Sequence, residues 1–128
     1  RREVAARRDA LEERLLAAAP GAIVAGKGAK RLPNTTCLLT SGWKGETQVM
    51  QMDLAGFAIS AGSACSSGKV KPSKTISAMG LNALATGGVR VSGGWGTVEG
   101  DWVRFADAWV AAYNKHKTRA AERVREVA

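Results

Sequence analysis

The apolar positions near the N-terminus recur with the period of an α-helix. Charged Arg and Glu residues separate them, and the pattern consists of Val4, Leu11, Leu15 and Ala18. A period near 3.6 residues places such positions on one face of a helix, and Pro20-Gly21 then interrupts it. The spacing predicts a helix over residues 1–19 with one face buried in a core.

A second helical pattern lies at the other end of the chain. Thr97 can cap it, and we expect it to run over about residues 98–127. Its aromatic residues form one apolar stripe, made of Trp102, Phe105, Trp109 and Tyr113. Such a stripe is typical of a face packed on a core, rather than of a cofactor site.

Between these helices, short apolar runs alternate with turn residues. The runs read as strands at residues 22–25, 35–40, 57–60 and 89–92. Two shorter helices are predicted at 46–55 and 73–79, with Gly56 as a C-cap of the first and Met50 and Met52 as core residues. This order predicts an α+β fold with a small, mostly antiparallel sheet covered by helices, as one domain over residues 1–128.

Composition narrows the class of protein. Hydrophobic residues make up 45% of the 128 positions, which is ordinary for a globular domain. No apolar run is long enough to cross a bilayer, so we expect no membrane partner.

The net charge of +8 raises nucleic acid as a possible class of partner. Acidic residues accompany the basic ones at both ends, and no stacking aromatics are interleaved with them, so a solvated basic surface is the better interpretation and no nucleic acid is expected.

The two cysteines lie in different settings. Cys37 lies in a strand-like run, whereas Cys65 lies in the Gly- and Ser-rich stretch 60–68, where small neighbours leave its sulfur uncovered. Such a thiol can act as a nucleophile or sulfur carrier, although a small buried hydrophobe remains the alternative. Two cysteines give no disulfide framework, so a cytoplasmic protein is expected.

Arg90 is the second candidate, because it stands alone between two valines of a predicted strand. Its side chain then points to the face opposite the valines. A guanidinium grips a carboxylate or phosphate in a forked geometry, but a solvated surface charge is equally compatible with the pattern. His116 is the one histidine and lies among basic residues, so neither a metal site nor a Ser-His-Asp triad is expected.

Several motifs in a fixed order resemble one known family. They are Arg31-Leu32-Pro33-Asn34-Thr35, Gly45-Glu46, Ser60-Ala61-Gly62-Ser63-Ala64-Cys65-Ser66-Ser67-Gly68, Lys71-Pro72-Ser73, Val89-Arg90-Val91-Ser92 and Thr97-Val98-Glu99. Together they resemble the C-terminal small domain of the pyridoxal-phosphate-dependent cysteine desulfurases of the class V aminotransferase family, in the group with a long cysteine loop. The fold implied is the C-terminal domain of fold-type I pyridoxal-phosphate enzymes.

The resemblance implies a role for each candidate. Cys65 would take sulfur from L-cysteine as a persulfide, leaving L-alanine, and Arg90 would bind the substrate carboxylate. Pyridoxal phosphate would be the electron sink. Sulfur would pass to an acceptor or iron–sulfur scaffold protein for cluster assembly or other sulfur transfer. The full enzyme would be a homodimer, and a relative that prefers selenocysteine is not distinguished.

The chain departs from the family in one important respect. The family's Schiff-base lysine follows a histidine in a large domain, and this chain lacks that context, since His116-Lys117 lies in the last predicted helix. No cofactor-binding residue is therefore expected here, and the fragment alone should be inactive without its large domain. The alternative is a stand-alone persulfide carrier or binding module that has no catalytic activity of its own.

Overall fold

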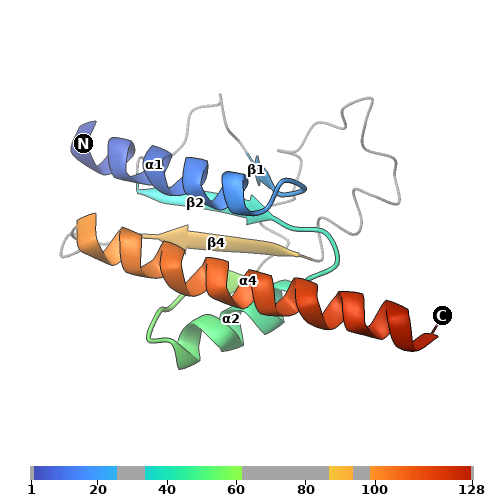
Figure 1. The fold of residues 1–128 in the computed structure, drawn as a ribbon. Helices are drawn as coiled ribbons and strands as arrows, with labels where there is room; N and C mark the ends of the chain where they lie inside the picture. The colour runs from blue at the N-terminus through green and yellow to red at the C-terminus, as the bar shows by residue number, and fades with distance from the viewer. Residues whose placement is uncertain (1, 26–33, 62–86, 94–98, 128) are drawn as a thin grey trace.

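The computed structural model describes residues 2–25, 34–61, 87–93 and 99–127. Three helices and four strands follow one another along this part of the chain (Figure 1). They are α1 (Arg2–Ala18), β1 (Ile23–Ala25), β2 (Thr35–Leu39), α2 (Gly45–Leu54), β3 (Ser60–Ala61), β4 (Gly88–Ser92) and α4 (Glu99–Val127). The predicted helix over residues 73–79 and the Thr97 cap lie outside the described residues.

The four strands form one antiparallel sheet in the order β1-β2-β4-β3. The central pair is β2 and β4, in which Cys37 faces Arg90 and Leu38 faces Val89. The expected α+β class with a small, mostly antiparallel sheet is confirmed. The element order along the described ranges also agrees with the predicted order.

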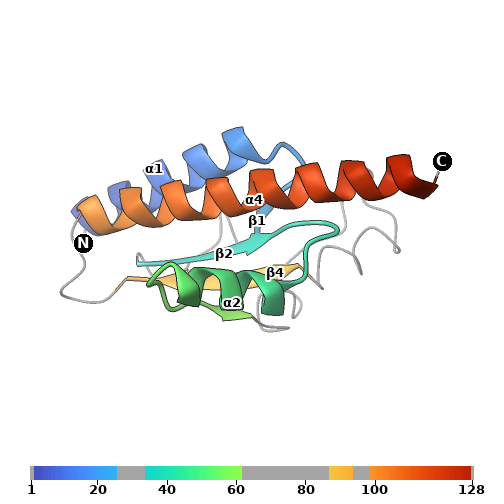
Figure 2. The ribbon, with the colours of Figure 1, turned by 60° about the horizontal axis from the view of Figure 1, so that its bottom comes forward.

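The helices α1 and α4 lie side by side over one face of this sheet (Figure 2). Alternation along each strand sends Val24, Leu38, Val89 and Val91 toward these helices, where all four are buried. The adjacent strand positions face the other way, and a smaller cluster forms there from Ala25, Leu39, Ile23 and Cys37. The sheet therefore has two chemically different faces.

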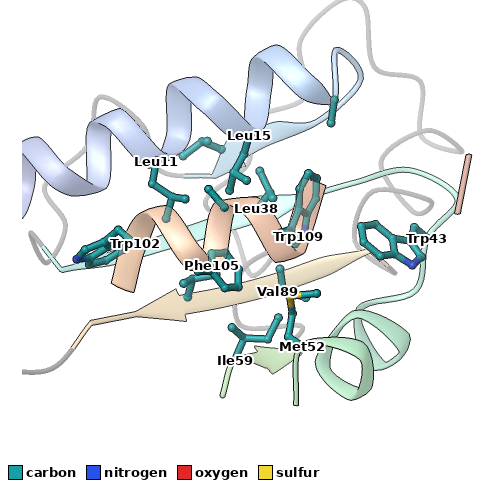
Figure 3. Packing of buried hydrophobic residues seen from close by; sticks show 14 residues of the cluster. Leu11, Leu15, Leu38, Trp43, Met52, Ile59, Val89, Trp102, Phe105 and Trp109 are labelled. Carbon is teal, nitrogen blue, oxygen red and sulfur yellow. The ribbon is translucent and has the colours of Figure 1, made fainter. Parts of the chain in front are cut away.

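The aromatic stripe of α4 forms the centre of the main core (Figure 3). Trp102, Phe105 and Trp109 are all buried, and Trp109 is completely so. Burying side chains of this size contributes about 1.5–3 kcal/mol each or more. Trp109 also stacks on Tyr113 at a centroid distance of 5.2 Å and lies 5.4 Å from Trp43. The predicted role of the stripe as a core face is confirmed.

Gln48 is a polar residue buried at the junction of α2, α4 and the sheet. Its side-chain amide donates to the Trp43 carbonyl oxygen at 3.0 Å and to Thr40 Oγ1 at 2.9 Å. Its Oε1 accepts a hydrogen bond of 3.1 Å from Trp109 Nε1. Because each of these groups is buried, the amide satisfies donors and acceptors that would otherwise be left without water.

The C-terminus of α2 explains why the third strand is shorter than expected. Gly56 has φ of 95° and its N–H bonds to the Asp53 carbonyl, while the Phe57 N–H bonds to the Met52 carbonyl. These two bonds are the Schellman motif, which confirms Gly56 as the residue that ends α2. Phe57 is therefore committed to the helix end, and the strand predicted over residues 57–60 begins at Ser60 instead.

One prediction for α2 is wrong in part. Met52 is buried at 1% exposure, as expected, but Met50 is 66% exposed. Leu54, four residues after Met50, is 83% exposed. Residues four apart share a helix face, so Met50 and Leu54 lie on the face of α2 turned away from the core.

Replacing Gln48 with Ala should destabilise the fold by about 2–4 kcal/mol, because it leaves a cavity and removes the partner of Trp109 Nε1. Urea unfolding followed by tryptophan fluorescence measures the change. Thr47→Ala, at the exposed neighbouring position, is the matched control. Equal stability of the two variants would contradict the importance of the buried amide.

Gly45 lies where α2 begins against the sheet. A Cβ at this position would lie 3.3 Å from Ala61 Cβ and closer still to the Gly88 carbonyl oxygen. Gly45→Ala should therefore cost about 1–3 kcal/mol through overpacking. Gly21→Ala has open space around the new methyl group and should change the unfolding free energy by less than about 0.5 kcal/mol. The same urea series tests the pair, and a harmless Gly45→Ala would contradict the close approach.

Candidate functional site

Arg90 lies in the middle of β4 and is exposed on the sheet face opposite α1 and α4. The sequence predicts this orientation, and the burial of Val89 and Val91 on the other side confirms it. Ion pairs among the described residues join Arg8 to Asp9, Arg14 to Asp107 and Arg104 to Asp101, and none of these involves Arg90. Its guanidinium thus faces away from the core without an acidic partner among the described residues, as an anion-binding group would.

Strand register places three further residues in one row with Arg90. Ala25 pairs with Cys37, Cys37 pairs with Arg90, and Arg90 pairs with Ser60. Directly opposed residues of an antiparallel sheet have their side chains on the same face, with Cβ atoms about 4.5–5.5 Å apart. We call this row of Ala25, Cys37, Arg90 and Ser60 the Arg90 row.

The two sides of the Arg90 row differ in chemistry. On the β2 side, the partly buried Cys37 belongs to the small apolar cluster with Ala25 and Leu39. On the β3 side, Ser60 presents an exposed hydroxyl. Another pair of hydroxyls lies on the same face two residues further along β4, where Thr35 Oγ1 and Ser92 Oγ are 3.2 Å apart. The guanidinium is flanked by an apolar surface on one side and by a hydrogen-bonding group on the other.

Cys65, the predicted nucleophile, lies outside the described residues. Its position in the sequence still relates it to the sheet, because β3 ends at Ala61, four residues earlier. Ala61 itself pairs with Val89, the neighbour of Arg90. In the sequence, Cys65 thus follows the strand that pairs with β4.

His116 has a structural environment that the sequence did not predict. Its ring stacks on Trp43 with centroids 5.4 Å apart and planes 17° apart, at the rim of the aromatic core. It lies on α4, which covers the opposite sheet face from Arg90. Among the described ranges, no group of His, Cys, Asp and Glu residues could hold a metal ion, and no helix is long and apolar enough to cross a membrane.

Two members of the Arg90 row, Cys37 and Ser60, were not identified as neighbours of Arg90 from the sequence. They are 23 positions apart in the chain and come from different strands. A sequence pattern gives the face of each strand position but not the register between strands. In the sequence, the signal for the direction of the Ser60 side chain was the change from the apolar Ile59 to the polar Ser60. The structure agrees with this signal, since Ile59 is buried and Ser60 is exposed.

Comparison with known proteins gives a consistent set of relatives. No family model matches the chain. The chain is 44% identical over 86 residues to a cysteine desulfurase of Cereibacter sphaeroides and 41% identical over 86 residues to the cysteine desulfurase NifS of Azotobacter vinelandii. The matches cover 66% and 67% of this chain but only 22% and 21% of the relatives. The chain thus corresponds to about a fifth of the length of these proteins.

Solved structures support the same fold. A NifS-like protein from Rickettsia africae superposes with a TM-score of 0.67, covering 87% of this chain and 28% of that one, at 19% identity. A second NifS-like protein gives a TM-score of 0.65 at 16% identity. The resemblance to part of the cysteine desulfurases is confirmed, and nothing in these comparisons favours a stand-alone persulfide carrier.

Proposed function

We propose that this chain is the C-terminal small domain of a cysteine desulfurase, which converts L-cysteine to L-alanine and holds the sulfur as a persulfide. The sequence likeness to curated cysteine desulfurases carries this proposal. The exposed Arg90 and the thiol-bearing stretch after β3 supply the two groups that the reaction needs from this domain. The single-domain organisation over residues 1–128 is part of the proposal.

Arg90 is the carboxylate-binding residue in this proposal. A planar guanidinium forms two parallel hydrogen bonds to a carboxylate, which fixes the orientation as well as the position of an amino acid. The middle of a paired strand is a suitable base for such a group, because β4 is held on both sides by β2 and β3. The substrate would therefore be oriented by a rigid element.

Cys65 is the sulfur-accepting nucleophile in this proposal. The thiolate attacks the substrate sulfur, an S–S bond forms, and the substrate C–S bond breaks. L-Cysteine and the thiol together contain the atoms of L-alanine and the persulfide, so the step needs no external oxidant or reductant. Small residues on both sides of Cys65 suit a group that must meet both substrate and acceptor.

Pyridoxal phosphate, which the resemblance implies, does not fit the described residues of this chain. The lysines among them are Lys44, Lys115 and Lys117, in the turn before α2 and on α4. Arg90 is directed to the opposite sheet face from α4. We therefore assign the cofactor to the large domain outside this chain, consistent with the small share of each relative that the chain covers.

The proposal extends to partners and location. The large domain would complete the active site, and the full enzyme would be a homodimer. A persulfide must leave through another thiol, so a sulfur-acceptor or iron–sulfur scaffold protein is the expected recipient. A reducing cytoplasm is compatible with this thiol chemistry.

Cys65→Ala in the full-length protein should abolish release of sulfide from L-cysteine, because no other group would accept the sulfur. Intact-mass spectrometry after incubation with L-cysteine should show one extra sulfur on the wild type and none on this variant. Cys37→Ala is the matched control and should still carry the extra sulfur. Sulfide release at the wild-type rate by Cys65→Ala would remove Cys65 from the role of nucleophile.

Arg90→Ala should raise KM for L-cysteine at least tenfold, since a hydrogen-bonded charge contact is worth about 1.5–3 kcal/mol. Arg90→Lys keeps the charge but loses the fork, and its KM should lie between those of Arg90→Ala and the wild type. Because Arg90 is exposed, the unfolding free energy should change by no more than about 0.5 kcal/mol. Steady-state kinetics and urea unfolding test both statements, and an unchanged KM would rule out carboxylate binding by Arg90.

A further inference from the structure

We infer that Ser60 is a second carboxylate-binding residue, which donates its hydroxyl hydrogen to the substrate carboxylate held by Arg90. The inference rests on the proposed function and assigns a further substrate contact within the same site. It is carried by the register of the sheet, which makes Ser60 the direct cross-strand neighbour of Arg90.

The geometry places both side chains on one face within reach of a single small anion. Cβ atoms of directly opposed residues lie about 4.5–5.5 Å apart, and both side chains are exposed. Buried Ile59 on the preceding position confirms that Ser60 points away from the main core. A long and flexible arginine side chain can lean toward the β3 side, where a carboxylate would then lie between the guanidinium and the hydroxyl.

A substrate carboxylate that already accepts two hydrogen bonds from the Arg90 guanidinium can accept a third from another donor. A carboxylate has two oxygens with about four acceptor positions, and a forked guanidinium occupies one position on each oxygen. A serine hydroxyl is a good donor, whereas the thiol of Cys37 on the other side is a weak one. The described residues therefore bias the anion toward β3 rather than toward the apolar cluster around Cys37.

Other hydroxyls on the same face are less suited to this role. Ser92 lies two residues after Arg90 on the same strand, and its Oγ lies 3.2 Å from Thr35 Oγ1. No such side-chain partner is described for Ser60, which leaves its hydroxyl to a ligand or to water. Ser92 is thus a matched control with the same chemistry, the same sheet face and a partner of its own.

The test uses the full-length enzyme with its cofactor and compares Ser60→Ala, Ser60→Thr and Ser92→Ala. Ser60→Ala should raise KM for L-cysteine about tenfold with kcat within about twofold of the wild type, because one hydrogen bond to a charged group is lost. Isothermal titration calorimetry with L-alanine should show about the same loss of affinity, since the product carries the same carboxylate. Ser60→Thr keeps the hydroxyl and should restore both values, and Ser92→Ala should match the wild type.

Each other outcome overturns the inference in a recognisable way. If the wild type releases sulfide but Ser60→Ala leaves KM and L-alanine affinity unchanged, Ser60 does not bind the carboxylate although the proposed function stands. The same conclusion follows if Ser60→Thr is as impaired as Ser60→Ala, or if only kcat falls. If the wild type releases no sulfide from L-cysteine, the proposed function fails and the role of Ser60 fails with it.

Discussion

The packing of the α4 aromatic stripe on one face of the sheet is the interaction on which the described structure depends. Trp109 occupies its centre, and its indole N–H is satisfied by the buried side chain of Gln48. That one amide also bonds to the Trp43 carbonyl and to Thr40, so it joins α2, α4 and the end of β2. Apolar burial supplies most of the stabilisation, while the amide fixes how the helices sit against the sheet.

The helices α1 and α4 cover one face of the sheet, and the proposed site lies on the other face. The strand alternation that buries Val89 and Val91 necessarily turns Arg90 outward. The same alternation buries Ile59 and exposes Ser60 on the neighbouring strand. The core and the proposed site are thus two consequences of one periodicity, and the rigidity of the core is available to hold the guanidinium in place.

The proposed function assigns this chain only part of an active site, which agrees with its length relative to its relatives. The chain covers about a fifth of the cysteine desulfurases that it matches. Its described residues place the Arg90 guanidinium and the Ser60 hydroxyl on one sheet face, where they suit an amino-acid carboxylate, and the described strands contain no lysine that would suit pyridoxal phosphate. In the proposed function, this domain orients the substrate and supplies the thiol, and the large domain holds the cofactor.

The sequence by itself determined the helices, the strands and the side of the sheet that Arg90 occupies, because these depend on local periodicity and capping. The motif around Cys65 likewise indicated the family, although the role of Cys65 stays a prediction. The tertiary structure alone decided that β3 begins at Ser60, since the Schellman bonds after α2 use the Phe57 N–H. It also decided that Met50 faces outward and that Cys37 and Ser60 flank Arg90. Register and helix orientation arise from contacts between residues far apart in the chain, which no local pattern contains.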